Sequence, residues 1–255
     1  MAWNSSTRRS AIKVLSTMIN QGINLSVVVP CHNSEISISK TFRTLETILP
    51  SSSEIVFVEN GSTDQTLRVL ADLSKTQLNK HMKVKILSSE KGLGNALRLG
   101  ILETSGKTVA FMADDLPFGN QEIELSHSVD SNKNELIAIS KYLEGSDYAT
   151  SFSRRVLGTT FLIFRQQLLN TKIKDTQGSF VGQGDLIRRL VSQTKENEFL
   201  ITTEIYLLAE LNGIHISEVP CKQSTMSPRA STVSLSAVAK MALGLVRLKI
   251  RMSKV

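Results

Sequence analysis

Short apolar runs alternate with amphipathic segments along most of the chain. Runs rich in β-branched and aromatic residues predict buried strands, and apolar residues at helical spacing predict helices. The predicted strands span 25–30, 54–58, 84–87, 108–113, 136–140 and 214–219. The predicted helices span 36–49, 63–73, 91–103, 154–169, 199–211 and 233–252, with Ser62 or Thr63 as the cap of the second. This alternation predicts βαβ units and an α/β fold with a mostly parallel sheet.

The pattern predicts three parts of unequal length. They are a polar N-terminal extension (1–23) with one helix near 11–19, a single domain (24–222), and a C-terminal part (223–255). The last part combines a flexible polar loop with a helix whose apolar positions are Val238, Met241, Ala242, Leu245, Leu248 and Met252. Its basic residues fall on another face and are Lys240, Arg247, Arg251 and Lys254. This pattern is typical of an interfacial helix attracted to anionic lipid, and equally of a core-packed helix with a solvated basic face.

Composition limits the classes of partner. The chain has 255 residues, of which 41% are hydrophobic and 21% charged, and these are ordinary globular values. Cys31 and Cys221 fit neither a disulfide framework nor a zinc pattern, so we expect a reducing, cytoplasmic compartment. No apolar run approaches the length of a membrane span. The net charge of +7 favours anionic partners, but the chain lacks a nucleic-acid-binding module, so we expect no nucleic acid partner. Homo-oligomer formation stays open.

Polar residues follow three of the predicted strands, at 30–35, 59–64 and 114–115. The carboxyl ends of parallel strands line one crevice, so these clusters are expected to converge. Asp114 and Asp115 could hold a divalent metal, Mg²⁺ or Mn²⁺, together with a diphosphate, or they could simply begin a turn. Glu59 could bind a nucleoside or take part in turn formation. Lys91 precedes a glycine-rich helix start, which could approach a phosphate.

The ordered motifs resemble a known family. Val-Val-Val-Pro-Cys-His-Asn (27–33), Val-Glu-Asn-Gly-Ser-Thr-Asp (58–64), Lys-Gly-Leu-Gly-Asn-Ala (91–96) and Phe-Met-Ala-Asp-Asp-Leu (111–116) are similar to the nucleotide-binding half of glycosyltransferase family 2. Ser-Lys-Tyr (140–142), Asp-Thr-Gln-Gly-Ser-Phe (175–180) and the segment 199–220 resemble its dolichol-phosphate mannose synthase, or polyprenyl-phosphate glycosyltransferase, branch. The resemblance covers roughly residues 24–222. It implies a GT-A fold with a Rossmann-like central sheet.

The resemblance also implies roles for residues on the donor side. Residues expected to bind the nucleotide sugar are Pro30, His32, Glu35, Glu59, Lys91, Asp114 and Asp115. Asp115 matches the last acid of the Asp-x-Asp motif that binds the metal, and Asp114 is a displaced second ligand. The sequence departs from the family at Ala113 and Pro117, where two further metal contacts are expected.

The acceptor side allows two interpretations. A phosphate monoester is largely ionised near neutral pH and needs cations more than a base. Lys141, Arg154 and Arg155 could supply those cations, and Asp175 and Gln177 could border the same site. A sugar hydroxyl would need a general base, for which Glu204 is the candidate.

Together these features predict an inverting glycosyltransferase associated peripherally with the cytoplasmic face of a membrane. It would transfer a hexose from a UDP- or GDP-linked sugar to a polyprenyl phosphate. The alternatives are a transferase acting on a polysaccharide hydroxyl and a non-catalytic relative that has lost its metal ligands.

Overall fold

A seven-stranded mixed sheet forms the centre of the computed structural model, which describes residues 22–79, 82–147, 152–223 and 235–253, with the side chains of 152–157 and 235–239 left out. The strand order is β3-β2-β1-β4-β6-β5-β7. Every neighbouring pair is parallel except the two pairs that include β6. The strands are β1 (Leu25–Cys31), β2 (Ser53–Asn60), β3 (Lys83–Ser89), β4 (Thr108–Phe111), β5 (Glu135–Ser140), β6 (Phe180–Gln183) and β7 (His215–Pro220). The predicted mostly parallel α/β fold is confirmed.

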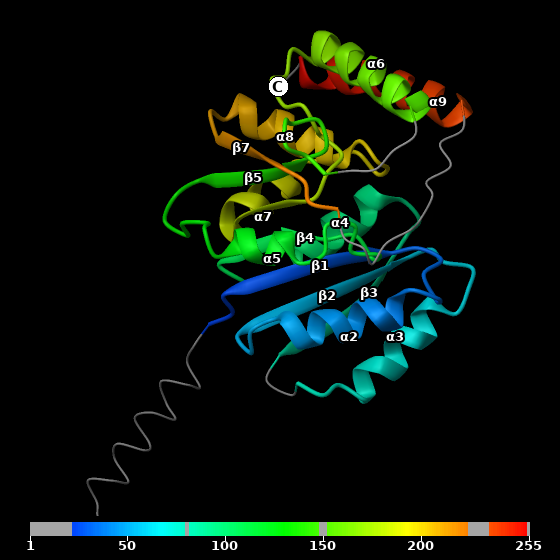
Figure 1. The fold of residues 1–255 in the computed structure, drawn as a ribbon, viewed down its shortest axis with the longest axis vertical. Coiled ribbons are helices and arrows are strands. Elements are labelled where there is room, and N and C mark those ends of the chain that lie inside the picture. Colours follow the sequence, from blue (N-terminus) through cyan, green and yellow to red (C-terminus); the bar gives the residue numbers. More distant parts are fainter. Residues whose placement is uncertain (1–21, 80–81, 148–151, 224–234, 254–255) are drawn as a thin grey trace, which may run out of the picture.

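Helices cover both faces of the sheet (Figure 1). The helices are α2 (Ile38–Ile48), α3 (Thr66–Lys75), α4 (Leu93–Leu102), α5 (Gln121–Ser126), α6 (Phe152–Leu169), α7 (Gly184–Ser192), α8 (Ile201–Leu211) and α9 (Leu235–Met252). Alternate side chains of each strand point to opposite faces, so Val28 packs with α4, α7 and α8, whereas Val27 and Val29 pack with α2, α3 and α5. The predicted N-terminal helix at 11–19 and the loop at 224–232 lie outside the described residues.

A third layer lies over α8. This helix is buried along nearly its whole length, because one side packs on the sheet and the other packs against α6 and α9. Leu200 and Leu207 meet Leu245 and Leu248 of α9 there. Figure 1 shows α6 and α9 side by side at the end of the molecule beyond α8. The apolar residues of α8 on the side away from the sheet need cover of their own, and the C-terminal helix docks on them.

The structure corrects several predicted boundaries. The central strand ends at Phe111 rather than at 113, so both aspartates lie in a turn beyond it. Helix α3 begins at Thr66, because the Asp64 carboxylate accepts a hydrogen bond from the Thr66 N–H at 3.0 Å. Three short elements, α5, β6 and α7, escape prediction. α5 and β6 are too short to show a clear period, whereas the helical spacing of Leu186, Ile187, Leu190 and Val191 in α7 was missed.

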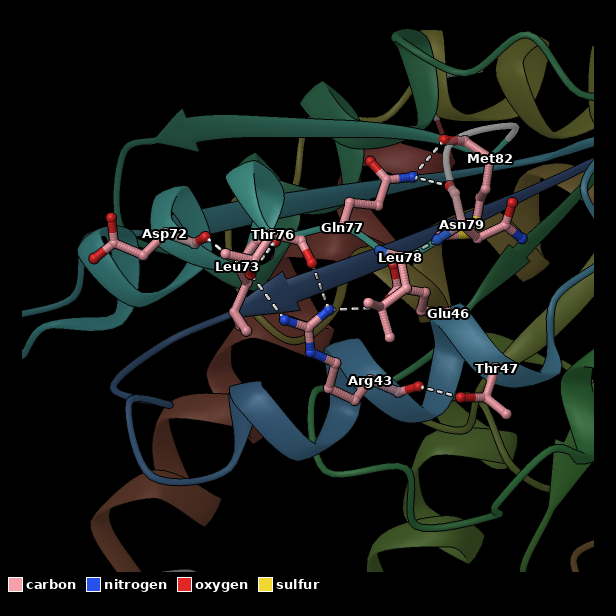
Figure 2. A network of polar contacts seen from close by, with 10 residues as sticks. All are labelled: Arg43, Glu46, Thr47, Asp72, Leu73, Thr76, Gln77, Leu78, Asn79 and Met82. Carbon is pink, nitrogen blue, oxygen red and sulfur yellow. Dashed lines mark hydrogen bonds and ion pairs between the residues drawn. The ribbon is translucent and has the colours of Figure 1, made fainter.

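A polar network joins α2 to the chain that follows α3 (Figure 2). The Glu46 carboxylate is buried and accepts hydrogen bonds from the backbone N–H groups of Leu78 and of Asn79, the latter at 3.0 Å. Arg43 donates to Glu46 at 2.7 Å and to the Thr76 carbonyl at 3.1 Å. These contacts tie α2 to the chain between α3 and β3.

Candidate active site

The strand order brings the polar clusters to one edge of the sheet. β4 is the central strand, and the turn that carries Asp114 and Asp115 follows its carboxyl end. β1 and β2 lie on one side of it, and β6, β5 and β7 on the other. The chain order reverses between β1 and β4, and ligands of open α/β sheets bind at such a switch point. The predicted donor residues therefore lie on one side of the acidic turn and the predicted acceptor residues on the other.

The loops after β1 and β2 are locked together by reciprocal hydrogen bonds. The Asn33 side chain accepts from the Thr63 N–H at 2.8 Å, and Asn33 has a φ of 50°, which asparagine tolerates better than most residues. The Glu35 N–H donates to the Asp64 carboxylate at 3.1 Å, and the Glu35 carboxylate accepts from the Gln65 N–H at 2.9 Å. Glu35 is thus engaged in holding the start of α3, and its role in nucleobase binding stays a prediction.

The remaining donor candidates lie at the ends of the same two strands. His32 donates from Nδ1 to the Asn60 carbonyl oxygen at 2.9 Å, a contact that joins the loop after β1 to the end of β2. Glu59 is only 8% exposed and accepts a hydrogen bond from the Ser62 N–H within its own turn. Pro30 is buried in β1. The turn chemistry predicted for Glu59 is present, and its contact with a nucleoside stays a prediction.

The acidic turn is tied to the β1 loop. The Ser34 hydroxyl donates to the Asp114 carboxylate, and the Thr41 hydroxyl donates to the Asp114 carbonyl at 2.6 Å. The buried Leu116 holds a φ of 47°, a backbone conformation that costs about 1 kcal/mol or more for a residue other than glycine. The contact of Ser34 was not predicted, because Ser34 and Asp114 are 80 residues apart in sequence and no local pattern links them.

The two carboxylates of the turn are enough protein ligands for a hard divalent cation such as Mg²⁺. Among the described residues no three His, Cys, Asp or Glu side chains gather as a metal site. Mg²⁺ nevertheless needs only one or two protein carboxylates when substrate phosphates complete its shell. Asp115, which is half-buried, supplies one such carboxylate, and Asp114 lies beside it in the turn. Both aspartates lie in the same turn beyond the end of β4.

The glycine-rich start of α4 corrects one interpretation. The Gly94 and Asn95 N–H groups donate to the Asn197 carbonyl oxygen at 2.9 and 3.3 Å. A Cβ at Gly94 would lie 2.2 Å from the Glu196 carbonyl oxygen, so the glycine makes room for protein backbone. The helix N-terminus is therefore occupied by a protein carbonyl rather than open to a phosphate. Lys91 is exposed, and its contact with the donor stays a prediction.

On the acceptor side, Asp175 organises the chain around it. Its carboxylate is 1% exposed and accepts hydrogen bonds from the backbone N–H groups of Lys141, at 3.1 Å, and of Gln177, at 3.0 Å. It thereby brings together the end of β5 and the loop before β6, and the Gln177 side chain is exposed there. The side chains of Arg154 and Arg155, in the first turn of α6, lie outside the described residues.

A buried arginine that the sequence did not single out supports this loop. Arg165 of α6 is 2% exposed and donates to the carbonyl oxygens of Ile173, at 3.1 Å, and Lys174, at 2.6 Å. Burial lowers the pKa of Arg165, and the negative charges of Asp175 and Glu218 oppose that effect. The signal in the sequence was an arginine directly after the apolar run 161–164.

Glu204 does not lie free as a general base would. It is 2% exposed and accepts hydrogen bonds from the Lys195 and Glu196 N–H groups at 2.9 and 2.8 Å. Its other carboxylate oxygen pairs with Arg251 at 2.9 Å. All these partners are within the protein, so the prediction of a catalytic Glu204 is not supported.

The structure decides between the two interpretations of the apolar stripe on α9. Leu245 and Leu248 of that stripe are fully buried, as the core-packed alternative requires. Leu243, Val246 and Ile250 are exposed instead. Within the described ranges, every helix is too short or too polar to span a bilayer.

These observations define a GT-A fold. Glucosyl-3-phosphoglycerate synthase from Mycobacterium tuberculosis, crystallised with Mn²⁺, UDP-glucose and phosphoglyceric acid, matches the structure with a TM-score of 0.61 at 17% identity. The match covers 92% of this chain and 81% of that one. The model of the family described as Glycosyl transferase family 2 matches residues 26–183. The chain belongs to this family and is a glycosyltransferase.

Two relatives indicate where the chain falls within the family. A dolichyl-phosphate β-glucosyltransferase of Dictyostelium discoideum is 27% identical over 250 residues, which are 90% of this chain and 75% of that protein. A dolichol-phosphate mannosyltransferase of Pyrococcus furiosus is 25% identical over 201 residues, which are 78% of this chain and 56% of that protein.

Proposed function

We propose that the protein transfers a hexose from a nucleotide diphosphate sugar to a polyprenyl phosphate of the dolichyl type. The observation that carries this proposal is the arrangement of the sheet edge, where an acidic turn lies between the residues predicted to bind the donor and those predicted to bind the acceptor. The names of the two relatives support a polyprenyl phosphate as the acceptor.

The donor side provides groups for a diphosphate and its metal. Asp115 would hold a divalent cation, Mg²⁺ or Mn²⁺, with Asp114 beside it, and the cation would neutralise the charge of the leaving diphosphate. Ser34 fixes Asp114 through its hydroxyl, and this contact keeps the turn against the β1 loop. His32 and Glu59 would contact the nucleoside at the ends of β1 and β2.

The acceptor side suits an anion that is already ionised. In the reaction an acceptor phosphate oxygen forms a bond to the anomeric carbon while the bond from that carbon to the diphosphate breaks. Lys141 and Arg154 would hold the acceptor phosphate, with Arg155 nearby, and Asp175 fixes the backbone at Lys141. The ion-paired Glu204 disfavours the alternative with a sugar hydroxyl, because that acceptor must lose a proton to a base.

The outer layer suits peripheral contact with an anionic membrane. Neither α6 nor α9 contains an aspartate or a glutamate. The exposed apolar residues of this layer are Ile163, Phe164, Leu243, Val246 and Ile250, and the exposed basic residues are Lys240, Arg247 and Lys249. Apolar and basic side chains on one surface are the combination that binds anionic lipid interfaces. We place this contact at the cytoplasmic face.

The test combines nucleotide binding with product formation. Calorimetric titration with UDP and with GDP, each with Mn²⁺ and again with EDTA, is expected to show metal-dependent binding of one nucleotide. A labelled sugar linked to the nucleotide that binds should then be transferred by the protein to polyprenyl phosphate in vesicles. Asp115→Asn should abolish this transfer, whereas Asp72→Asn, at an exposed side chain of α3, should leave it unchanged.

Each other outcome has a definite meaning. Full activity of Asp115→Asn would contradict the metal-binding role. Transfer to oligosaccharides but not to lipid phosphate would favour the polysaccharide alternative. Absence of binding to either nucleotide would favour the non-catalytic alternative, for which Ala113 and Pro117 are the support in the sequence.

A further inference from the structure

A single arginine of the C-terminal helix reaches into the body of the protein. Arg251 Nη2 lies 2.7 Å from a carboxylate oxygen of Glu196 and 2.9 Å from one of Glu204. The two carboxylates are shielded from solvent, with side-chain exposures of 16% and 2%. Carboxylates this close to one cation and this far from water depend on that cation for their neutralisation.

The turn held by this cluster is the one that closes the start of α4. Glu204 accepts hydrogen bonds from the Lys195 and Glu196 N–H groups. The carbonyl of the following residue, Asn197, accepts from the Gly94 and Asn95 N–H groups. The turn thereby satisfies backbone donors that a helix N-terminus otherwise leaves unpaired.

The 195–197 turn and the start of α4 are in close van der Waals contact. Added Cβ atoms at Gly92 and Gly94 would each lie 2.2 Å from a carbonyl oxygen of the turn. Arg98 of α4 also donates to the Glu196 carbonyl oxygen at 2.5 Å. A displacement of the turn must therefore displace the first turn of α4.

The first turn of α4 is in turn joined to the donor cluster. The Gly92 N–H donates to the Asn60 side-chain oxygen at 2.7 Å, and the Asn60 carbonyl accepts from His32. A Cβ at Gly61 would lie 2.9 Å from Cβ of Lys91, so β2 and the start of α4 are in close contact. Every link from Arg251 to His32 is a direct contact.

We propose that Arg251 is a positioning residue for the donor site, through which the C-terminal helix controls donor affinity. The inference rests on the proposed function, because it assumes that the nucleotide sugar binds at the ends of β1 and β2. Loss of Arg251 removes the guanidinium that pairs with both the Glu196 and the Glu204 carboxylates, since Arg98 contacts the main-chain carbonyl of Glu196 instead. Repulsion between the two carboxylates shifts the 195–197 turn, and α4 and Lys91 shift with it.

The test uses the full-length protein without membranes. Arg251→Gln is expected to weaken binding of UDP or GDP, whichever the wild type binds, by about tenfold. It should also speed hydrogen exchange at the Gly94 and Asn95 amides. Adding Glu204→Gln removes one of the two facing carboxylates and should restore much of both properties. Arg189→Gln, at an exposed arginine of α7, is the matched control and should change neither.

The outcomes separate this inference from the proposed function. Unchanged affinity and unchanged amide exchange in Arg251→Gln, with normal wild-type binding, would overturn the inference alone. A wild type that binds neither nucleotide would refute the proposed function and the inference with it. Should Arg251→Gln not fold, Arg251→Lys tests the same point, because one ammonium satisfies two carboxylates less well and a smaller loss of affinity is expected. Wild-type affinity in that variant would refute the inference.

Discussion

Replacement of Glu122 by glutamine is expected to remove a pH-dependent loss of stability. Glu122 lies in the first turn of α5, is 1% exposed, and has one carboxylate oxygen without a hydrogen-bond partner among the described residues. Burial raises the pKa of this carboxyl from 4.5 to about 7, and a hydrogen bond with Ser179 only partly opposes the effect. The folded protein therefore favours the neutral acid.

The size and sign of the effect follow from linkage. Below pH 4.5 the group is protonated in both the folded and the unfolded state, and its contribution to stability is fully present. Between 4.5 and about 7 the unfolded chain releases the proton while the folded protein keeps it, so the free energy of unfolding falls as the pH rises. The full loss is about 3 kcal/mol, reached above the folded-state pKa.

Urea denaturation of the wild type and of Glu122→Gln at several pH values between 4.5 and 8 measures this term. Glutamine is neutral in both states, so the variant's free energy of unfolding minus that of the wild type should rise by about 3 kcal/mol over this range. The other titrating groups are common to both proteins and cancel in the difference.

Glu124→Gln, which makes the same replacement at an exposed position of the same helix, provides the control. A difference for Glu122→Gln that stayed constant from pH 4.5 to 8 would refute the reasoning. It would mean that Glu122 is ionised in the folded protein and has a partner at neutral pH.

Three further substitutions should lower the free energy of unfolding in urea. Glu54→Gln should cost about 2 kcal/mol at pH 7, because the fully buried Glu54 carboxylate accepts from the Ser26 hydroxyl at 2.6 Å. Gly94→Ala should cost about 2 kcal/mol, since its Cβ would meet the Glu196 carbonyl at 2.2 Å. Arg165→Lys should cost about 2 kcal/mol, because an ammonium does not reproduce the contacts of a buried guanidinium with two main-chain carbonyls.

Gly22→Ala is the control for Gly94→Ala, because a Cβ at Gly22 meets no atom within 4 Å. A loss of stability below about 0.5 kcal/mol in any of the three variants would contradict the contact on which its prediction rests.

The contribution of Glu54 to stability should also depend on pH. Burial tends to raise the pKa of Glu54, but hydrogen bonds from Ser26 and Ser105 and the charge of Lys85 outweigh it and lower this pKa. The stability that Glu54 contributes is therefore present above pH 4.5 and is lost as the pH falls through the lowered value.

The sequence alone determined the elements with a strong local pattern. A buried strand such as β1 and an amphipathic helix such as α2 are recognisable because each burial period is complete within a few residues. The polar clusters after β1, β2 and β4 were also recognisable, since the parallel arrangement brings the ends of these strands to one edge. The family resemblance rests on the same motifs, and the family match confirms it.

Only the tertiary structure decided what those side chains contact. Glu204 and Arg251 are 47 residues apart in sequence, and no local pattern shows that they form an ion pair. The start of α4 looked open to a phosphate until the Asn197 carbonyl was seen to occupy it. Helical periodicity identified an apolar stripe on α9, but whether it meets protein or lipid depends on α8. The reason is physical, because burial and hydrogen bonding at these positions are set by partners distant along the chain.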